Sequence, residues 1–318
     1  MKAINIEKEF QNSRIININE PVVNDGQSLL NVKAVGICQS DIARVFNQSA
    51  YYYPIILGHE FSGVLENGDK ATIFPIIPCM ECDECKKENY AQCKNYSYYG
   101  SRQSGGMQER MAINNWNIIR NNNLDFDELA VIEPSAVAMN ACKKVPEDAE
   151  IILINGCGFI ALVAAQILLY NGKKVYIRNR NKEKLKYSLD NFNLIEYNNQ
   201  SIDCIIDFVS RTESINFIID HIKSHGTIIA VGNPTSDISI EKANYSKILR
   251  KELIIKGIWN SRREDWYDIM KLIENKNVSI KKLITHRYEY TDFKTAFEKI
   301  KNNQINFNEL IIKSIIEF

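Results

Sequence analysis

The sequence predicts an α/β fold in which a doubly wound parallel sheet is inserted into a mostly β domain. Three observations support this prediction. Between residues 151 and 232, continuous apolar runs alternate with helical patterns, as in buried parallel strands connected by helices. Up to about residue 142, short strand patterns are separated by loops that contain Gly and Pro. After about residue 265, strand and helix patterns are mixed again, which indicates that this last segment completes the first domain.

The individual elements follow from these patterns in chain order. In the first part we expect strands at 28–37, 61–65 and 70–76, and a helix at 129–143, where Ala, Val and Met recur at helical spacing. In the middle part the expected order is strand 151–155, helix 159–170, strand 173–179, a lysine-rich helix from 182, strand 203–209 and strand 226–232. The predicted domains are therefore residues 1–142 with 261–318, and residues 143–260.

Composition excludes several classes of function. The chain of 318 residues carries 39 basic and 39 acidic side chains, so no net charge attracts nucleic acid or an anionic membrane. Its first residues are charged and lack the apolar stretch of a signal peptide, and no run approaches the roughly 18 apolar residues of a membrane span. Eight cysteines without a secretory signal indicate metal ligands and free thiols in a reducing cytoplasm. We expect a cytoplasmic protein that acts on small molecules.

Four cysteines have the spacing of a metal site, Cys79-x2-Cys82-x2-Cys85-x7-Cys93. Four thiolates this close along the chain can surround one Zn²⁺ tetrahedrally and leave no open position for a substrate. The spacing therefore predicts a structural zinc that orders an irregular lobe. The alternatives are four ordinary thiols or two disulfides.

A glycine-rich turn follows the predicted strand 151–155. Its sequence, GCGFIA at 156–161, matches the G-x-G-x-x-G/A fingerprint of dinucleotide-binding Rossmann folds, in which the backbone approaches a pyrophosphate at a helix N-terminus. The residues expected to contact the dinucleotide are Gly156, Gly158, Phe159 and Ile160. The alternative interpretation is a plain tight turn.

The end of the next strand favours NADP(H) over NAD(H). An acidic residue there would bind the 2′-hydroxyl of NAD. This chain has Asn179 at that position, between Arg178 and Arg180, so nothing repels a 2′-phosphate and two guanidinium groups are close enough to pair with it. The alternative is that both arginines are solvated at the surface and that NAD binds through looser contacts.

Three other residues have the side chains of a catalytic zinc site. Cys38, His59 and Glu133 supply the Cys, His and carboxylate ligands that leave a fourth position open. Glu60 directly follows His59 and could exchange onto the metal or act behind the ligands. A single His is more often an ordinary core or surface residue, and the other three (His221, His225 and His286) are interpreted in that way.

These motifs together resemble one known family. The segment GHEFSG at 58–63, the four-cysteine lobe, the Glu-Pro pair at 133–134 and the dinucleotide loop occur in the order found in the zinc-dependent medium-chain alcohol and polyol dehydrogenases, over nearly the whole chain. The resemblance implies a GroES-like catalytic domain and a Rossmann domain, two zinc ions per chain, and Ser40 near the reacting alcohol. It also implies a homodimer formed through an edge strand near residues 253–258.

The same resemblance implies hydride transfer between NAD(P)(H) and a polyol phosphate, with the pair galactitol 1-phosphate and tagatose 6-phosphate as the first choice. One alternative is an NADPH-dependent reductase of ribulose 5-phosphate. Another is a non-catalytic, zinc-stabilised nucleotide-binding or regulatory module. A zinc-free enone reductase is disfavoured because all three presumed zinc ligands are present.

A phosphorylated substrate requires cationic side chains near the site. Arg102 and Arg44 are the first candidates, and Arg262 and Arg263 are the less favoured ones. The alternative for each is a surface ion pair, which contributes about 0–1 kcal/mol. The chain also departs from the family pattern at Ala43, where some members relay protons through His, so Ser40 and Glu60 are the residues expected to move the proton.

Overall fold

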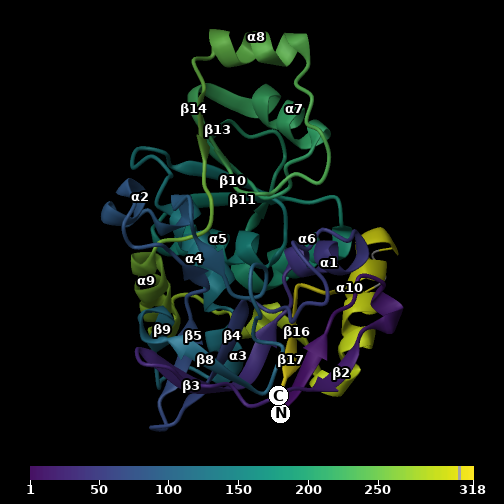
Figure 1. Ribbon diagram of the computed structural model, residues 1–318. Coiled ribbons are helices and arrows are strands. Elements are labelled where there is room, and N and C mark those ends of the chain that lie inside the picture. Colours follow the sequence, from purple (N-terminus) through teal and green to yellow (C-terminus); the bar gives the residue numbers. More distant parts are fainter. Residues whose placement is uncertain (307–308) are drawn as a thin grey trace. The chain divides into compact units, whose positions relative to one another are not determined.

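The computed structural model describes residues 1–306 and 309–318 (Figure 1). The chain divides into two compact units. Unit 1 contains residues 1–134, 262–266 and 280–318, and unit 2 contains residues 135–261 and 267–279. The predicted domains differ from these units mainly in residues 135–142 and 267–279, which group with unit 2.

Unit 1 is built on a seven-stranded sheet with the order β16-β17-β3-β4-β5-β9, and β8 also pairs with β3. All pairs are antiparallel except β16 with β17. The strands are β3 (Gln27–Gly36), β4 (Glu60–Leu65), β5 (Lys70–Ile73), β8 (Arg110–Asn114), β9 (Ile118–Arg120), β16 (Ile284–Glu289) and β17 (Lys313–Glu317). Two small sheets join β1 (Lys2–Asn5) with β2 (Arg14–Asn17), and β6 (Ile76–Ile77) with β7 (Ser97–Tyr98).

The helices of unit 1 are short except for the last one. They are α1 (Gln39–Phe46), α2 (Asp83–Lys86), α3 (Phe126–Ala130) and α10 (Phe293–Asn306). Apolar residues at Phe293, Ala296, Phe297 and Ile300 have the i, i+3, i+4, i+7 spacing of a helix with one apolar face. This face of α10 is buried in the hydrophobic core together with residues of β3 and β4.

The predicted helix 129–143 is two helices in the structure. Helix α3 ends at Ala130, and α4 (Ile132–Cys142) begins after Val131. Short 3-10 helices complete the chain at η1 (Phe10–Asn12), η2 (Tyr90–Gln92), η3 (Asn115–Asn117), η4 (Lys281–Leu283) and η5 (Tyr290–Asp292).

Unit 2 contains a six-stranded parallel sheet with the order β12-β11-β10-β13-β14-β15. Its strands are β10 (Ile151–Asn155), β11 (Lys174–Arg178), β12 (Ile195–Glu196), β13 (Ile202–Asp207), β14 (Ile222–Ala230) and β15 (Ile254–Gly257). The helices are α4, α5 (Phe159–Tyr170), α6 (Lys182–Phe192), α7 (Thr212–His221), α8 (Lys242–Arg250) and α9 (Arg263–Glu274). Helix α9 begins in unit 1 and continues in unit 2.

In chain order, the six parallel strands have the order 3-2-1-4-5-6, which is the order of the doubly wound dinucleotide-binding fold. The direction of winding reverses between β10 and β13, so the loop after β10 lies at the switch point where such sheets bind ligands. Helix α5 is apolar on nearly all sides and nine of its residues are buried, as expected for a helix inside such a fold. The predicted α/β fold class is confirmed.

Asp203 ties together the beginnings of two parallel strands in unit 2. Its Oδ2 accepts hydrogen bonds from the backbone N–H groups of Ile151 (2.8 Å) and Glu150 (3.1 Å), and its Oδ1 accepts one from Lys223 Nζ (2.6 Å). Partial burial acts to raise the pKa of Asp203, but these donors outweigh it and lower the pKa below its ordinary value. Because the pKa is lower in the folded state, the resulting stability is present above the unfolded pKa and is lost as the pH falls through the folded one.

We therefore expect Asp203→Asn to lower the free energy of unfolding by about 1–3 kcal/mol at pH 7. The difference from the unsubstituted protein should shrink below about pH 4, because the carboxylate is then protonated in the unfolded chain, and vanish at lower pH. Urea unfolding followed by circular dichroism at pH 7 and pH 3 measures this. The exposed Asp190 on α6 provides the control Asp190→Asn. An equal loss of stability at both pH values would contradict the electrostatic explanation.

Candidate metal centres and cofactor loop

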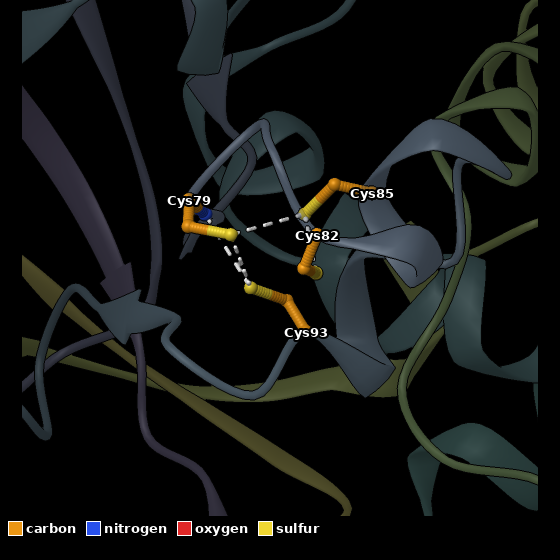
Figure 2. Close-up of side chains that lie close together, drawn as sticks. All are labelled: Cys79, Cys82, Cys85 and Cys93. Atoms are coloured by element: carbon orange, nitrogen blue, oxygen red, sulfur yellow. Dashed lines mark hydrogen bonds between the residues drawn. The ribbon is translucent and has the colours of Figure 1, made fainter.

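The four cysteines of the spaced motif lie together in one lobe of unit 1, and Figure 2 shows their side chains pointing toward a common centre. The Sγ atoms of Cys79 and Cys85 are 3.8 Å apart, those of Cys82 and Cys85 3.5 Å, and those of Cys93 and Cys79 3.5 Å. Zn–S bonds of about 2.3 Å in a tetrahedron require sulfur atoms about 3.8 Å apart. A disulfide would need about 2.05 Å. The four thiols therefore fit a zinc ion and are not disulfide-bonded.

The backbone of this lobe favours thiolates, the form that binds metal. The N–H of Cys85 donates to the Cys82 sulfur and lowers the pKa of Cys82 to about 6. The pKa of Cys79 is also lowered, chiefly by the N–H of Glu81. These donors stabilise the thiolates of Cys79 and Cys82, whereas burial raises the pKa of Cys85 to about 12.

We expect Cys93→Ser to reduce the zinc content by one ion per chain and to lower the thermal midpoint of unfolding by several degrees. The reason is that three thiolates hold zinc more weakly, and the lobe has little apolar core of its own. Metal analysis and calorimetry check this expectation. Cys142 is a buried free thiol outside the lobe, so Cys142→Ala is the control and should keep its zinc. An unchanged zinc content in Cys93→Ser would show that the four thiols do not hold one ion.

A second group of metal-binding side chains consists of Cys38, His59 and Glu60, whose ligand atoms lie within 4.8 Å of one another. Cys38 is the N-cap residue of α1, and Glu60 is the first residue of β4. Gly58 sets the backbone of the turn before His59: its φ is +97°, and a Cβ there would lie 2.7 Å from Val35 Cγ1. The start of α1 and the start of β4 thus bring a thiol, an imidazole and a carboxylate together.

Asp41 lies behind this group and was not identified from the sequence. Its fully buried carboxylate accepts hydrogen bonds from the Cys38 N–H (3.1 Å) and from Arg44 Nη1 (2.9 Å), and its Oδ1 is 3.5 Å from His59 Nδ1. Burial acts to lower the pKa of His59, but the charges of Asp41 and Cys38 and their hydrogen bonds to the ring together outweigh it and raise the pKa well above its ordinary value. A carboxylate behind a His orients the ring of a metal ligand. The sequence signal that could have identified Asp41 is its spacing, since it follows Cys38 by three residues at the start of a helix.

Glu133 lies near the group but is not one of its three members. Its side chain is buried, and its Oε1 accepts a hydrogen bond from the Tyr98 hydroxyl at 3.2 Å. Desolvation, together with the nearby charge of Glu60 and despite His59, raises the pKa of Glu133 to about 7. Tyr98 also packs near His59, with ring centroids 5.7 Å apart, and is a second residue that the sequence did not single out.

The group fits a zinc ion for two reasons. Sulfur, nitrogen and oxygen donors are the ligands that zinc accepts. In addition, one ligand atom from each of the three residues lies within 4.8 Å of the other two, which is close enough for all three to hold one ion.

The candidate phosphate-binding arginines have different surroundings. Arg44 is largely buried, and its Nη1 donates to Ser40 Oγ at 2.8 Å as well as to Asp41. Arg102 is exposed, and its guanidinium carbon lies 4.0 Å from the ring centroid of Tyr96 and 5.1 Å from that of Tyr51. Its Nη1 donates to the Tyr96 carbonyl at 2.8 Å. Arg44 is thus engaged behind the metal group, whereas Arg102 is held in place with its charge at the surface.

The other arginines considered for the phosphate are engaged as well. Arg262 donates to Asn89 Oδ1 at 3.1 Å. Arg263 lies over the Trp116 ring at 4.8 Å and donates to the Trp116 carbonyl.

In unit 2 the glycine-rich loop lies between β10 and α5 as predicted. Gly156 has φ +120°, a conformation that favours Gly, and Gly158 is the N-cap of α5, where an added Cβ would meet nothing within 4 Å. The helix that begins at Phe159 and Ile160 therefore presents its N-terminus beside an uncrowded backbone, as anion binding requires.

The two arginines at the end of β11 and just after it are not equivalent. The guanidinium of Arg178 packs 3.4 Å from the ring centroid of Phe217, and its Nη1 is buried. Arg180 is exposed, and Asn179 Oδ1 accepts a hydrogen bond from the Asn181 N–H at 3.4 Å. Of the two arginines, Arg180 is the one at the surface.

Comparisons with known proteins agree with these observations. Residues 24–123 match the family described as the alcohol dehydrogenase GroES-like domain. Galactitol 1-phosphate 5-dehydrogenase of Escherichia coli K12 is 29% identical over 315 aligned positions, and the match covers 88% of this chain and 91% of the relative. L-galactonate-5-dehydrogenase of the same organism is 27% identical over 325 aligned positions, and the match covers 94% of each chain. The crystal structure of galactitol-1-phosphate dehydrogenase from Escherichia coli superposes with a TM-score of 0.89 at 25% identity, covering 100% of both chains.

The fold and the two groups of metal-binding side chains define a medium-chain dehydrogenase. Residues 24–123 match the GroES-like domain of alcohol dehydrogenases, and nearly the whole chain is similar to zinc-dependent alcohol and polyol dehydrogenases, which are oxidoreductases that use a nicotinamide cofactor. None of the helices in the described part of the chain has the length and apolarity needed to cross a bilayer.

Proposed function

We propose that this enzyme transfers hydride between NADP(H) and a polyol phosphate/ketose phosphate pair, with galactitol 1-phosphate and tagatose 6-phosphate as the preferred pair. The observation that carries the proposal is the group of Cys38, His59 and Glu60, which offers three ligands to one metal. The similarity to galactitol 1-phosphate 5-dehydrogenase supports the choice of substrate.

For the catalytic zinc we assign Cys38, His59 and Glu60 as ligands, because their ligand atoms lie within 4.8 Å. Glu133 was expected to be the third ligand. Its hydrogen bond with Tyr98 and its place outside the group favour a role behind the metal. The second zinc is assigned to Cys79, Cys82, Cys85 and Cys93.

When bound, zinc polarises the substrate oxygen and the nicotinamide gives or accepts the hydride. The chain positions the groups around that oxygen. Asp41 orients His59 through Nδ1, and Arg44 donates to Ser40 Oγ. Because that oxygen already accepts from Arg44, the Ser40 hydroxyl is oriented to donate its proton elsewhere. We assign Ser40 as the group that carries the proton between the substrate oxygen and solvent.

Arg102 is the proposed phosphate anchor. Its guanidinium is exposed and fixed between Tyr51 and Tyr96, so little freedom is lost when it pairs with a phosphate. The Tyr96 and Tyr98 rings are 6.4 Å apart, and Tyr98 in turn packs near His59. A continuous set of rings thus connects the anchor to the metal group within unit 1. Arg44 is reassigned to positioning Ser40.

The proposed cofactor preference and assembly rest on unit 2. Asn179 in place of an acidic residue and the exposed Arg180 support NADP(H). Strand β15 is the edge of the parallel sheet, and Ile254 and Ile255 are each 49% exposed while Trp259 is 55% exposed. An apolar, unpaired edge strand supports the proposed homodimer. A cytoplasmic location is proposed because none of the eight cysteines forms a disulfide in the structure.

Initial rates of reduction by NADPH and NADH test the proposal, with tagatose 6-phosphate, ribulose 5-phosphate and the two unphosphorylated ketoses as substrates. We expect the highest kcat/KM with NADPH and tagatose 6-phosphate. A preference for ribulose 5-phosphate would instead indicate that the enzyme synthesises ribitol 5-phosphate. If no ketose phosphate is reduced by an enzyme that contains two zinc ions, the sugar phosphate assignment is wrong.

A further inference from the structure

A buried ion pair adjoins the proposed catalytic metal group. Lys313 Nζ contacts Glu60 Oε2, and their side chains are only 6% and 1% exposed. Lys313 begins β17, Glu60 begins β4, and β3 lies between these two strands in the sheet. The dehydrogenase chemistry described above assigns no role to this lysine.

The central strand β3 leaves room for this pair. Gly36 is the register partner of Glu60, and its neighbour on the other side is Ile315 of β17. A Cβ at Gly36 would lie 2.2 Å from Glu60 Oε2 and 3.1 Å from Lys313 Cε. Glycine is unfavourable inside a strand, and it commonly marks a place where another group approaches the backbone closely. Here the approaching groups are the carboxylate and the lysine stem.

Lys313 also contacts the segment that carries another ligand. Its Nζ donates to the Ile37 carbonyl at 3.2 Å, directly before Cys38. A carboxylate has two oxygens with about four acceptor sites, so the ammonium group can compensate the Glu60 charge without occupying all of its acceptor capacity.

We propose that Lys313 is a positioning residue that shares the Glu60 carboxylate with the metal and so weakens Glu60 as a ligand. The inference rests on the proposed zinc site at Cys38, His59 and Glu60. Two effects act in the same direction. The ammonium charge competes for the carboxylate, and it repels a divalent cation through a medium of low dielectric constant. With Lys313 in place, Glu60 is a ligand that can leave the metal.

The test is the rate at which the purified holoenzyme releases zinc to a chromogenic chelator. The release phase that is missing from Cys38→Ser reports the catalytic site. We expect Lys313→Met to slow this phase about tenfold, which corresponds to about 1.4 kcal/mol of lost competition for the carboxylate. In the Glu60→Gln background the same substitution should change the rate less than about twofold, since the carboxylate is no longer present. Lys281→Met, which removes an exposed lysine paired with Asp125, is the control.

Faster or unchanged release in Lys313→Met would overturn the inference, as would equal slowing with and without the Glu60 carboxylate. If Lys313→Met does not fold, Lys313→Gln replaces it, because the amide still donates to Glu60 while the charge is removed; slower release is again expected, and any other result counts against the inference. A wild-type enzyme that lacks the Cys38-dependent phase would instead refute the proposed zinc site itself, together with this inference.

Discussion

Cys38→Ser is expected to lower kcat by at least about 1,000-fold. Metal polarisation of the substrate oxygen contributes several kcal/mol to transition-state stabilisation. Losing about 4 kcal/mol of it corresponds to about three powers of ten in rate. The Ser hydroxyl is a far weaker ligand than a thiolate, whereas the backbone N–H of residue 38 still donates to Asp41 and Ser is a favourable N-cap, so the start of α1 is kept. Steady-state kinetics with NADPH and the best ketose phosphate measure the loss.

The same variant should bind NADPH nearly as well as the unsubstituted protein, because the glycine-rich loop and the end of β11 lie in unit 2. Titration of nicotinamide fluorescence tests this part. Zinc content should fall by one ion per chain, as in Cys93→Ser, but only Cys38→Ser should combine that loss with a large loss of turnover and little loss of stability. Turnover within tenfold of the unsubstituted enzyme would refute the assignment of Cys38 as a ligand of the catalytic zinc.

The local parts of the structure could be predicted from the sequence. Cys79 to Cys93 span few residues, so their spacing nearly determines whether four thiols can meet. The parallel sheet was predicted because each buried strand is a continuous apolar run and the strands alternate with helices. The family was likewise recognised from short motifs, and the comparisons confirm it.

The residues that support the site were harder to predict, because they are distant in sequence or because their role depends on the direction in which the side chain points. Lys313 is 276 residues from Ile37, whose carbonyl it contacts, and no periodicity links them. Arg178 and Arg180 look alike in the sequence, yet one packs on Phe217 and the other is exposed. Which side of a strand end a side chain takes depends on tertiary packing.

Arg44 illustrates a signal that was present but given another interpretation. It follows Asp41 by three residues on α1, the spacing at which opposite charges pair along a helix. That pairing competes with any role in binding phosphate. The choice between the carboxylates of Glu60 and Glu133 required tertiary geometry, since both are acidic residues in motif segments and only the first lies within the ligand group.

Arg102→Met is expected to lower kcat/KM for the phosphorylated ketose about 100-fold and to change kcat/KM for the unphosphorylated ketose less than about threefold. A guanidinium paired with a phosphate makes charge-assisted hydrogen bonds worth about 1.5–3 kcal/mol each, and 2.7 kcal/mol corresponds to about 100-fold. Methionine preserves much of the apolar packing between Tyr51 and Tyr96 but removes the charge. The ratio of the two kcat/KM values isolates the phosphate contribution from any general damage to the site.

Two further variants make this test specific. Arg102→Lys keeps the charge but loses the planar fork that binds a phosphate through two parallel bonds, so an intermediate loss is expected. Arg262→Met removes an exposed arginine of the same unit, whose Nη2 donates to Asn89, and should leave both substrates nearly unaffected. If Arg102→Met slows both ketoses equally, the arginine stabilises the tyrosines around it and does not bind the phosphate. If Arg262→Met alone discriminates between them, the phosphate is bound near the zinc lobe and the anchor must be reassigned to Arg262.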